Sequence, residues 1–368
     1  MRVAYVCADP GIPVLGTKGA SVHVRAVVRE LVRRGHEVTV HCTRRGDGEA
    51  SLLGGAALVV HPVAAGPVAD RERAIAAAAA AIARAVAAEA PDLVYERYAL
   101  FSDAAARIGA PSVLEVDAPL VEEQATHREL ADAAGALATT RRALAAADVV
   151  ACVSRPLVAW AEALGAARCV LAPNGVDLAA HPPRARRGGA TLEAVFVGTI
   201  RPWHGLETAI EAMAGLEGVR LTVVGDGPAL PALRERARAL GASVRWLGAL
   251  PHEAVPAVLA GMDAGLAPYP SAAARYFSPL KVVEYLAAGL AVVGSALPQV
   301  TDVVDDRTGL LVPPDDPAAL AGALVALRDD RDALERRCAA ARADAEARHA
   351  WSAVVDRILA AMPAGVRA

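Results

Sequence analysis

The sequence has no cysteine pattern of the kind that binds metals or forms redox pairs. Its five cysteines show no C-x-x-C spacing and no grouping with histidine. The first four stand in apolar, strand-like runs, and we expect them to be small core residues. This usage fits a reducing, cytoplasmic location. The five residues are Cys7, Cys42, Cys152, Cys169 and Cys338.

Long apolar runs and an excess of positive charge are also missing. No stretch approaches the roughly 20 apolar residues that span a bilayer, and Asp9 follows the first apolar run too early for a signal peptide. The formal net charge of -3 excludes the basic bias of a general nucleic-acid binder. We therefore expect a soluble, cytoplasmic protein without a nucleic-acid partner. Peripheral contact with the inner face of a membrane stays an alternative.

Several nucleotide-binding and catalytic fingerprints are absent as well. Gly225 and Gly227 do not continue into G-x-G-x-x-G, because the third position holds Leu230. The segment from Gly16 to Gly19 lacks the spacing of a P-loop, and no G-x-S-x-G is present. The histidines are scattered, and no D-x-D stands in a suitable loop. These absences argue against a dinucleotide-binding enzyme, a P-loop NTPase and a serine hydrolase, and they predict neither a metal nor a cofactor.

What the sequence does contain is an alternation of apolar runs with segments of helical period, in both halves of the chain. Such alternation predicts parallel sheets covered by helices on both faces. The expected strands cover residues 2–7, 37–42, 57–61, 92–95, 112–116, 149–153, 168–171, 192–197, 220–224, 243–246, 264–267, 291–293 and 309–312. The expected helices cover residues 20–34, 71–88, 100–108, 120–147, 206–216, 229–240, 254–260, 280–288 and 317–327, followed by charged helices of which the last begins at Trp351.

The length of 368 residues exceeds one ordinary core and predicts two domains. A stretch rich in proline, glycine and charge separates the two alternating halves and is typical of a linker. The expected N-terminal domain covers residues 1–172, the linker 173–190 and the C-terminal domain 191–349, while a C-terminal helix at 350–368 packs back on the first domain. Ligands of such sheets bind beyond the carboxyl ends of the strands, so we expect the site in a cleft between the domains.

The run from Tyr276 to Gly289, YFSPLKVVEYLAAG, is the most informative stretch. Pro279 stands at a helix start, where its missing N–H leaves no bond unmade. Lys281 lies in the first turn and Glu284 one turn later on the same face. A cation beside free helix amides suits a phosphate, and a carboxylate suits sugar hydroxyls. The alternative is a pair of solvated helix charges, but the apolar neighbours indicate a buried helix, in which charges need partners.

Together with this run, six other pieces follow one another along nearly the whole chain. In sequence order the seven are LGTKGASVHV with RRGHEVTV, PNGVD, VFVGTIRPWHG, LTVVGDGP, VRWLGALPHEAVPAVLAGMD, SPLKVVEYLAAG and TGLLVPPDDPAAL. With them the chain resembles the retaining nucleotide-sugar glycosyltransferases of family 4. The resemblance implies a GT-B fold of two Rossmann-like domains. It also implies metal-independent transfer of a sugar from a nucleoside diphosphate sugar to a hydroxyl acceptor with retained configuration. The acceptor would be a glycan, a glycolipid or a natural product.

The same resemblance implies contacts with the donor around the start of the helix expected at 280–288. Glu284 matches the second glutamate of the family's E-x7-E motif, which holds the ribose hydroxyls. The position of the first glutamate holds Tyr276. Contact with the donor sugar therefore passes to Ser278 or to the backbone of the adjoining Pro279 and Leu280, and the choice of donor sugar is not readable.

The family's diphosphate grip, an arginine and a lysine, should fall in VGTIRPWHG, where this chain has Thr199 and His204. We expect Arg201 and Lys281 to supply the missing positive charge, with His204 behind them, because a departing diphosphate needs cationic or amide partners. The alternative for His204 is a hydrogen-bonded residue at a helix start.

In the first domain the resemblance directs attention to Asp117, where many relatives carry a histidine beside the reacting sugar. A carboxylate there could position or deprotonate the acceptor hydroxyl, or bind a donor hydroxyl. The alternative is an N-cap for the helix from Leu120. Nearby acidic alternatives are Glu115, Glu122 and Glu123.

Backbone contacts complete the expected site. Gly19, followed by Ala20, lets the main chain approach the diphosphate closely. Ala249 and Leu250 stand in the loop that meets the nucleotide base, mainly through backbone groups. Two other functions are kept as alternatives: a nucleotide-sugar 2-epimerase of GT-B fold, and a catalytically silent subunit that partners another transferase, which the loss of the first glutamate suggests.

Overall fold

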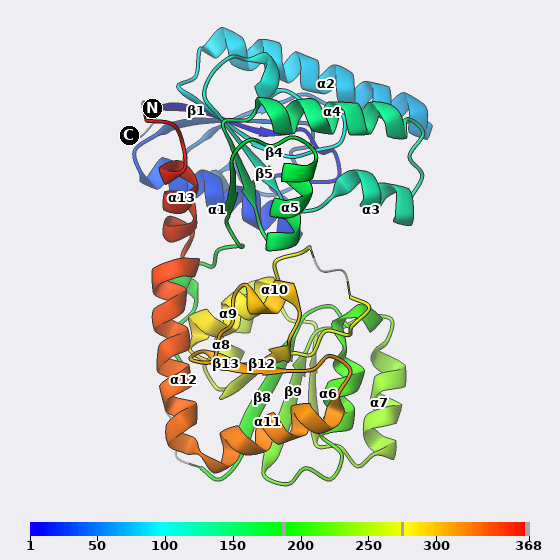
Figure 1. Cartoon of the computed structure of the whole chain (residues 1–368), viewed down its shortest axis with the longest axis vertical. Coiled ribbons are helices and arrows are strands. Elements are labelled where there is room, and N and C mark those ends of the chain that lie inside the picture. The colour runs from blue at the N-terminus through cyan, green and yellow to red at the C-terminus, as the bar shows by residue number, and fades with distance from the viewer. Residues whose placement is uncertain (186–188, 274–275, 365–368) are drawn as a thin grey trace. The chain divides into compact units, whose positions relative to one another are not determined.

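The computed structural model describes residues 1–185, 189–273 and 276–364, and these form two compact units (Figure 1). Unit 1 comprises Met1–Pro173 and Val354–Ala368, and unit 2 comprises Asn174–Ala353. Each unit is a parallel sheet with helices on both faces (Figure 1). The predicted α/β class with two Rossmann-like units is confirmed.

Unit 1 has a seven-stranded sheet in the order β3-β2-β1-β4-β5-β6-β7. Its strands are β1 Arg2–Cys7, β2 Glu37–Cys42, β3 Ala57–Val60, β4 Leu93–Arg97, β5 Ser112–Val116, β6 Val149–Cys152 and β7 Cys169–Leu171. Its helices are α1 Gly19–Arg33, α2 Val68–Glu89, α3 Leu120–His127, α4 Ala133–Ala146 and α5 Arg155–Ala163, with 3-10 turns at Ala50–Leu53 and Ala105–Arg107. The last helix of the chain, α13 Trp351–Ala360, joins this unit from Val354 onward.

Unit 2 has a six-stranded sheet in the order β10-β9-β8-β11-β12-β13. Its strands are β8 Leu192–Val197, β9 Val219–Val224, β10 Val244–Gly248, β11 Ala264–Ala267, β12 Ala291–Ser295 and β13 Gly309–Val312. Its α-helices are α6 Leu206–Ala212, α7 Leu230–Ala239, α8 Val255–Leu259, α9 Leu280–Ala288, α10 Pro298–Thr301, α11 Pro317–Asp329 and α12 Arg331–Asp344. Shorter turns cover Leu178–Ala180, Pro202–His204, His252–Ala254 and Ala345–His349.

Strand order reverses once in each sheet, between β1 and β4 in unit 1 and between β8 and β11 in unit 2. At such a switch point the connections leave in opposite directions and open a crevice at the carboxyl ends of the strands. The physics of the fold therefore directs the search for ligand contacts to the ends of these four strands.

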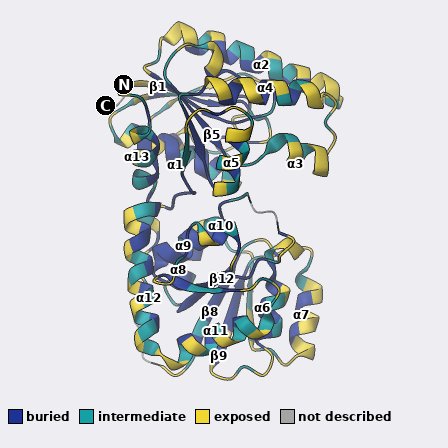
Figure 2. Cartoon of the chain, in the orientation of Figure 1, coloured by how far each residue is buried: buried dark blue, intermediate teal, exposed yellow. Residues whose placement is uncertain are grey.

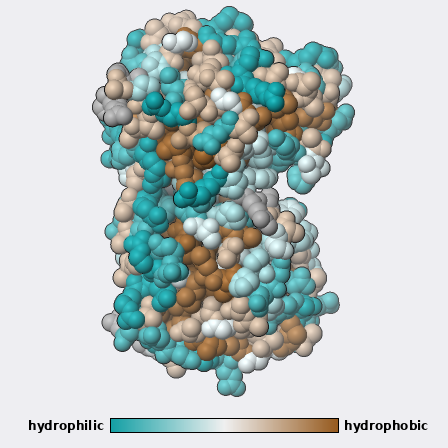
Figure 3. Space-filling model, in the orientation of Figure 1, coloured by the Kyte–Doolittle hydropathy of each residue, from teal (hydrophilic) through white to brown (hydrophobic). Residues whose placement is uncertain are grey.

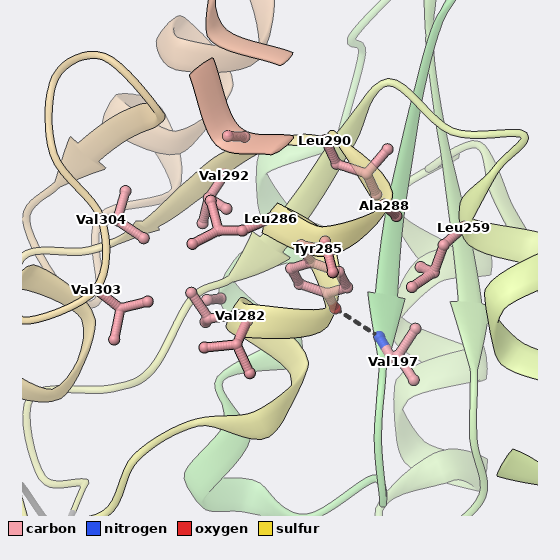
Figure 4. Packing of buried hydrophobic residues seen from close by; sticks show 14 of the residues in the cluster. Val197, Leu259, Val282, Tyr285, Leu286, Ala288, Leu290, Val292, Val303 and Val304 are labelled. Carbon is pink, nitrogen blue, oxygen red and sulfur yellow. Dashed lines mark hydrogen bonds between the residues drawn. The ribbon is translucent and has the colours of Figure 1, made fainter. Parts of the chain in front are cut away.

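The core of unit 2 is built around α9, which is buried along almost its whole length (Figure 2). The Tyr285 ring points toward β8, and the Val197 N–H donates to the Tyr285 hydroxyl over 2.9 Å (Figure 4). Val282 and Leu286 belong to the same buried cluster. The predicted burial of this helix is confirmed. By contrast, the outer face of α12 is hydrophilic (Figure 3), as its many charged residues predict.

Two helix predictions in unit 1 need correction, and one helix was missed. Residues 100–108 form only a short 3-10 turn, because Phe101 takes a left-handed φ of 61° and the Glu96 carboxylate accepts from the Ala105 N–H over 2.7 Å. Residues 120–147 form two helices, since Glu72 accepts from the Ala131 and Asp132 amides between them. Helix α5, at Arg155–Ala163, was not expected, although Pro156 stands in its first turn as helix starts favour.

Much of the segment predicted as a linker packs within unit 2. Val176 pairs with Ala350 as an isolated parallel bridge, and the Arg184 guanidinium contacts Asp263 and Glu335. Residues 186–188 of the predicted linker and residues 365–368 of the predicted C-terminal helix lie outside the described residues. Within the described ranges, no helix combines the length and the apolar character needed to cross a bilayer.

Candidate functional site

Lys281 places a buried ammonium group at the switch point of unit 2. Its Nζ lies 4.0 Å from the ring centroid of Phe196 in β8 and 5.5 Å from that of Tyr269, just after β11. The residue is 8% exposed, and Nζ has no hydrogen-bond partner among the described residues. A side chain at Gly198, whose φ is 140°, would bring its Cβ to 3.0 Å from Nζ. The glycine therefore leaves room for the cation.

Burial weakens the charge on both polar residues of α9. It lowers the pKa of Lys281 to about 7, although the Glu284 carboxylate acts in the opposite direction. It raises the pKa of Glu284 to about 7, against the influence of Lys281. The Glu284 side chain is 13% exposed, and its Oε1 lies 3.7 Å from Nε2 of His252. A cation and a carboxylate without tight partners are well suited to take up an anion and hydroxyl groups from a ligand.

The loop between β8 and α6 carries His204 and Arg201. The Nδ1–H of His204 donates to the Thr199 carbonyl. Burial, together with the charges of Lys281 and Arg201, lowers the pKa of His204 to about 4, although the hydrogen bond to Thr199 acts in the opposite direction. The imidazole is therefore neutral at pH 7 and supplies no positive charge, and the hydrogen-bonded alternative describes it well.

Arg201 lies at the surface, whereas Lys281 is enclosed. Its guanidinium carbon is 5.5 Å from the ring centroid of the exposed Trp203. The structure thus stacks Arg201 on that indole rather than on the Phe196 and Tyr269 rings that surround the lysine.

The SPLK loop is tied to the start of unit 2. The Asn174 N–H donates to the Ser278 hydroxyl, and the Asn174 side-chain amide donates to the Ser278 carbonyl, each over 3.0 Å. Both residues are buried. Sequence reasoning noted PNGVD but missed Asn174 as the partner that holds this loop. Pro279 is the N-cap of α9 and Leu280 its first residue, and no side chain caps the helix.

Other expected backbone contacts lie at carboxyl ends of strands or at helix starts. Ala249 is exposed directly after β10, while Leu250 packs partly on the core. Gly19 is the first residue of α1, where it is exposed, and Ala20 is half-buried.

In unit 1, Asp117 belongs to a cluster of charges at the β1–β4 switch point. Its Oδ2 lies 2.9 Å from Arg97 at the end of β4, and its Oδ1 lies 3.6 Å from His23 in α1. The N-cap alternative for Asp117 is wrong, because Pro119 holds the N-cap of α3 and no side chain caps that helix. Of the acidic alternatives, Glu115 joins this cluster, 2.9 Å from His23. Glu122 instead accepts from the Trp160 indole N–H, and Glu123 is half-buried in α3.

No three His, Cys, Asp or Glu side chains of the described residues are grouped closely enough to hold a metal ion. The groups that Lys281 and Glu284 in unit 2 and the Asp117 cluster in unit 1 present to a ligand are cations, carboxylates and backbone amides.

Comparison with known proteins identifies the family. Residues 17–180 match the family described as Glycosyltransferase Family 4, and residues 191–330 match the one described as Glycosyl transferases group 1. This chain belongs to the family 4, group 1 glycosyltransferases. The resemblance found in the sequence is thereby confirmed.

Curated relatives of this family 4 member have several named activities. The chain is 35% identical over 207 residues to the phosphatidyl-myo-inositol mannosyltransferase of Mycobacterium leprae. The matched region covers 54% of each protein. It is 31% identical over 200 residues to a Mycobacterium tuberculosis glycogen synthase, covering 52% of this chain and 47% of that protein. The chain thus spans about half the length of the curated relatives that it matches.

Solved structures confirm the GT-B fold. The sucrose-phosphate synthase of Thermosynechococcus elongatus superposes with a TM-score of 0.72 at 22% identity, covering 97% of this chain and 96% of that one. Anabaena HepE in complex with UDP superposes with a TM-score of 0.72 at 19% identity, covering 97% and 98%.

Proposed function

We propose that this family 4 member moves a sugar from a nucleoside diphosphate sugar to a hydroxyl acceptor, with retention of configuration and without a metal ion. The observation that carries the proposal is the buried ammonium of Lys281 at the β8–β11 switch point, whose Nζ has no hydrogen-bond partner among the described residues. The named activities of the mannosyltransferase and glycogen synthase relatives support transfer. The UDP and UDP-glucose bound to HepE support a nucleoside diphosphate donor.

Lys281 and the uncapped start of α9 would stabilise the departing diphosphate. The ammonium supplies charge, and the first helix amides supply donors aimed in the direction of the helix N-terminus. Glu284 would accept from the ribose hydroxyls. Arg201, on the neighbouring loop, is the second proposed cation, while His204 holds the Thr199 carbonyl and so shapes that loop.

The remaining contacts are proposed as backbone or hydroxyl contacts with the donor. They come from Ser278, Pro279 and Leu280 at the start of α9, from Ala249 and Leu250 after β10, and from Gly19 and Ala20 at the start of α1. In the reaction, the bond between the anomeric carbon and the diphosphate oxygen breaks. The acceptor oxygen bonds to that carbon from the same face, and the acceptor proton passes to the departing diphosphate. No enzyme nucleophile is required, unlike in retaining hydrolases.

A cytoplasmic location, with or without contact to a membrane surface, is part of the proposal. It is supported by the five free cysteines of the described chain.

Ligand-induced thermal shifts with UDP, GDP, ADP and TDP test the proposal. One of them should stabilise the protein, by about 2.7 kcal/mol at a concentration of 100 Kd, and Lys281→Met should lose most of that stabilisation. Nucleotide release from the matching sugar nucleotide, followed by NMR of the product's anomeric configuration, then tests retention. Binding of none of the four would contradict the proposal.

The same assay separates the alternatives. A sugar nucleotide that returns as its C2 epimer without an acceptor would favour the epimerase. Nucleotide binding without turnover of any donor, even with water as acceptor, would favour the silent subunit.

A further inference from the structure

Four ionisable side chains, three of them buried and the fourth, Asp117, half-buried, meet at the β1–β4 switch point of unit 1. They come from three elements that are far apart in the sequence: His23 from α1, Arg97 from β4, and Glu115 and Asp117 from β5 and the residue after it. Arg97 lies 2.9 Å from Asp117 and 3.6 Å from Glu115, and His23 lies 2.9 Å from Glu115. With His23 protonated, the cluster has two positive and two negative charges.

Two tyrosines, Tyr95 and Tyr5, adjoin the cluster. The Tyr95 hydroxyl donates to Glu115 over 2.7 Å, and the Tyr95 ring stacks on Tyr5 with centroids 5.3 Å apart. Burying four charges is expensive unless each is paired and hydrogen-bonded. A surface helix and two strands could be held together at far lower cost by apolar side chains. Stability alone therefore does not explain why charged residues occupy these positions.

Asp117 is the most accessible member, with its side chain 21% exposed, whereas the side chains of His23 and Arg97 are 5% and 9% exposed. One carboxylate oxygen faces Arg97 and the other faces His23. Arg97 thus holds one carboxylate oxygen at 2.9 Å, while the His23 imidazole lies beside the other at 3.6 Å, beyond hydrogen-bond distance. A carboxylate oriented in this way can accept a hydrogen bond from a ligand hydroxyl.

We propose that His23 and Arg97 are positioning residues, which hold the Asp117 carboxylate in a fixed orientation so that it accepts a hydrogen bond from a hydroxyl of a reacting sugar. This inference rests on the proposed function. It assigns roles to His23 and Arg97 that are independent of nucleotide binding, which belongs to Lys281 and Glu284 in unit 2.

Electrostatics agree with a protonated His23. Burial alone lowers the pKa of His23, but the Glu115 and Asp117 carboxylates more than offset this and raise it above its usual value, despite the opposing charge of Arg97. The groups that face the imidazole are Glu115 and Asp117 from the β5 side and Arg97 from β4. The imidazolium is therefore favoured up to a higher pH than in a free histidine.

Two measurements test the inference. The first is 15N NMR of histidine-labelled full-length protein, with the His23 ring assigned by its absence in His23→Gln. We expect the His23 ring of the wild type to lose its proton at a higher pH than a free histidine. In Glu115→Gln the ring should become neutral at lower pH than in the wild type, because one of the two carboxylates that stabilise its charge is gone. A His23 ring that loses its proton no later than a free histidine in the wild type would overturn the inference.

The second measurement is steady-state donor hydrolysis, with water as acceptor and the nucleotide sugar selected by the binding screen. His23→Gln should lower kcat by up to about 100-fold, the loss typical of a reacting group misplaced by about 1 Å, with KM and the nucleotide-induced thermal shift within about twofold of wild type. Turnover in the wild type should decline at alkaline pH, and Glu115→Gln should move that decline to lower pH. Arg97→Lys should retain more turnover than Arg97→Met.

Arg184→Lys is the matched control, since Arg184 is an equally buried arginine that contacts two carboxylates in unit 2, Asp263 and Glu335. It should lower stability without changing kcat or the pH profile. Wild-type kcat and pH profile in His23→Gln, or an equal loss in Arg184→Lys, would overturn the inference. A wild type that binds no nucleoside diphosphate would instead contradict the proposed function.

Discussion

Replacing Lys281 with methionine should strengthen the fold and weaken the ligand site at the same time. Methionine has nearly the same length and fits the surroundings of Phe196 and Tyr269 without a polar group to bury. The lysine ammonium, by contrast, is desolvated on folding, and its Nζ has no hydrogen-bond partner among the described residues. Stability and binding are thus expected to change in opposite directions.

The magnitude follows from the pKa of Lys281. Its fall from 10.5 to about 7 means that burial disfavours the charged form, by about 5 kcal/mol at 1.36 kcal/mol per pH unit. The unfolded chain stays protonated up to its ordinary pKa, so the cost of burial is full below pH 7 and disappears as pH rises toward 10.5. The pKa of about 7 already includes the favourable interaction with Glu284, and relaxation around a buried charge makes the cost smaller than this figure. We therefore expect Lys281→Met to raise the free energy of unfolding at pH 7 by about 2–4 kcal/mol, and by much less at pH 10.

The assay is urea denaturation of wild type and Lys281→Met at both pH values, paired with calorimetric titration of the nucleoside diphosphate. Binding should weaken by about 10- to 150-fold, because a hydrogen bond to a charged group contributes about 1.5–3 kcal/mol. Arg238→Met, which removes an exposed arginine in the last turn of α7, is the control and should alter neither quantity strongly. A Lys281→Met protein that is less stable than wild type and binds the nucleotide equally well would refute the reasoning.

Three further outcomes are expected. Nucleotide affinity of the wild type should fall as pH rises above about 7, because the free protein then loses the Lys281 proton, whose pKa is about 7. Calorimetry at pH 8 in two buffers of different ionisation enthalpy should accordingly show proton uptake, and its absence would contradict this. Glu284→Ala should bind the nucleotide and its 2′-deoxy analogue equally, whereas the wild type should prefer the ribose form; an unchanged preference in the variant would argue against a ribose contact. Asn174→Ala should keep the backbone hydrogen bond to the Ser278 hydroxyl but lose the side-chain bond to the buried Ser278 carbonyl, at a cost of about 1–3 kcal/mol of stability by denaturation and part of the nucleotide affinity. A variant as stable as wild type would show that this side-chain bond does not hold the loop.

Local patterns in the sequence predicted most of the sheets and the polar pair of α9. Apolar runs of four to six residues are sufficient to place buried strands. The three-residue spacing of Lys281 and Glu284 places them on one helix face whatever surrounds them. Residues 100–108 show the limit of such reasoning, since their helical period is overridden by the buried Glu96 carboxylate, which binds backbone and side-chain donors of that segment.

Contacts between distant segments could not be predicted in the same way. Asn174 and Ser278 are 104 positions apart, and His23, Arg97 and Asp117 come together only because β1, β4 and β5 are neighbours in the sheet. A histidine in the apolar α1 and an arginine at the end of a buried strand were the available clues. The charge of His204 depends on burial, which its neighbours in the sequence do not reveal.

The central claim is that Lys281 binds the diphosphate of a nucleotide sugar. NMR of lysine labelled at Cε and Nζ tests this claim most directly. The sequence has only two lysines, Lys18 and Lys281, so the spectrum is simple to assign. We predict that Lys281 titrates with a pKa of about 7 in the free protein and that a saturating nucleoside diphosphate raises this pKa. A Lys281 signal that titrates at the same pH with and without the nucleotide would contradict the account.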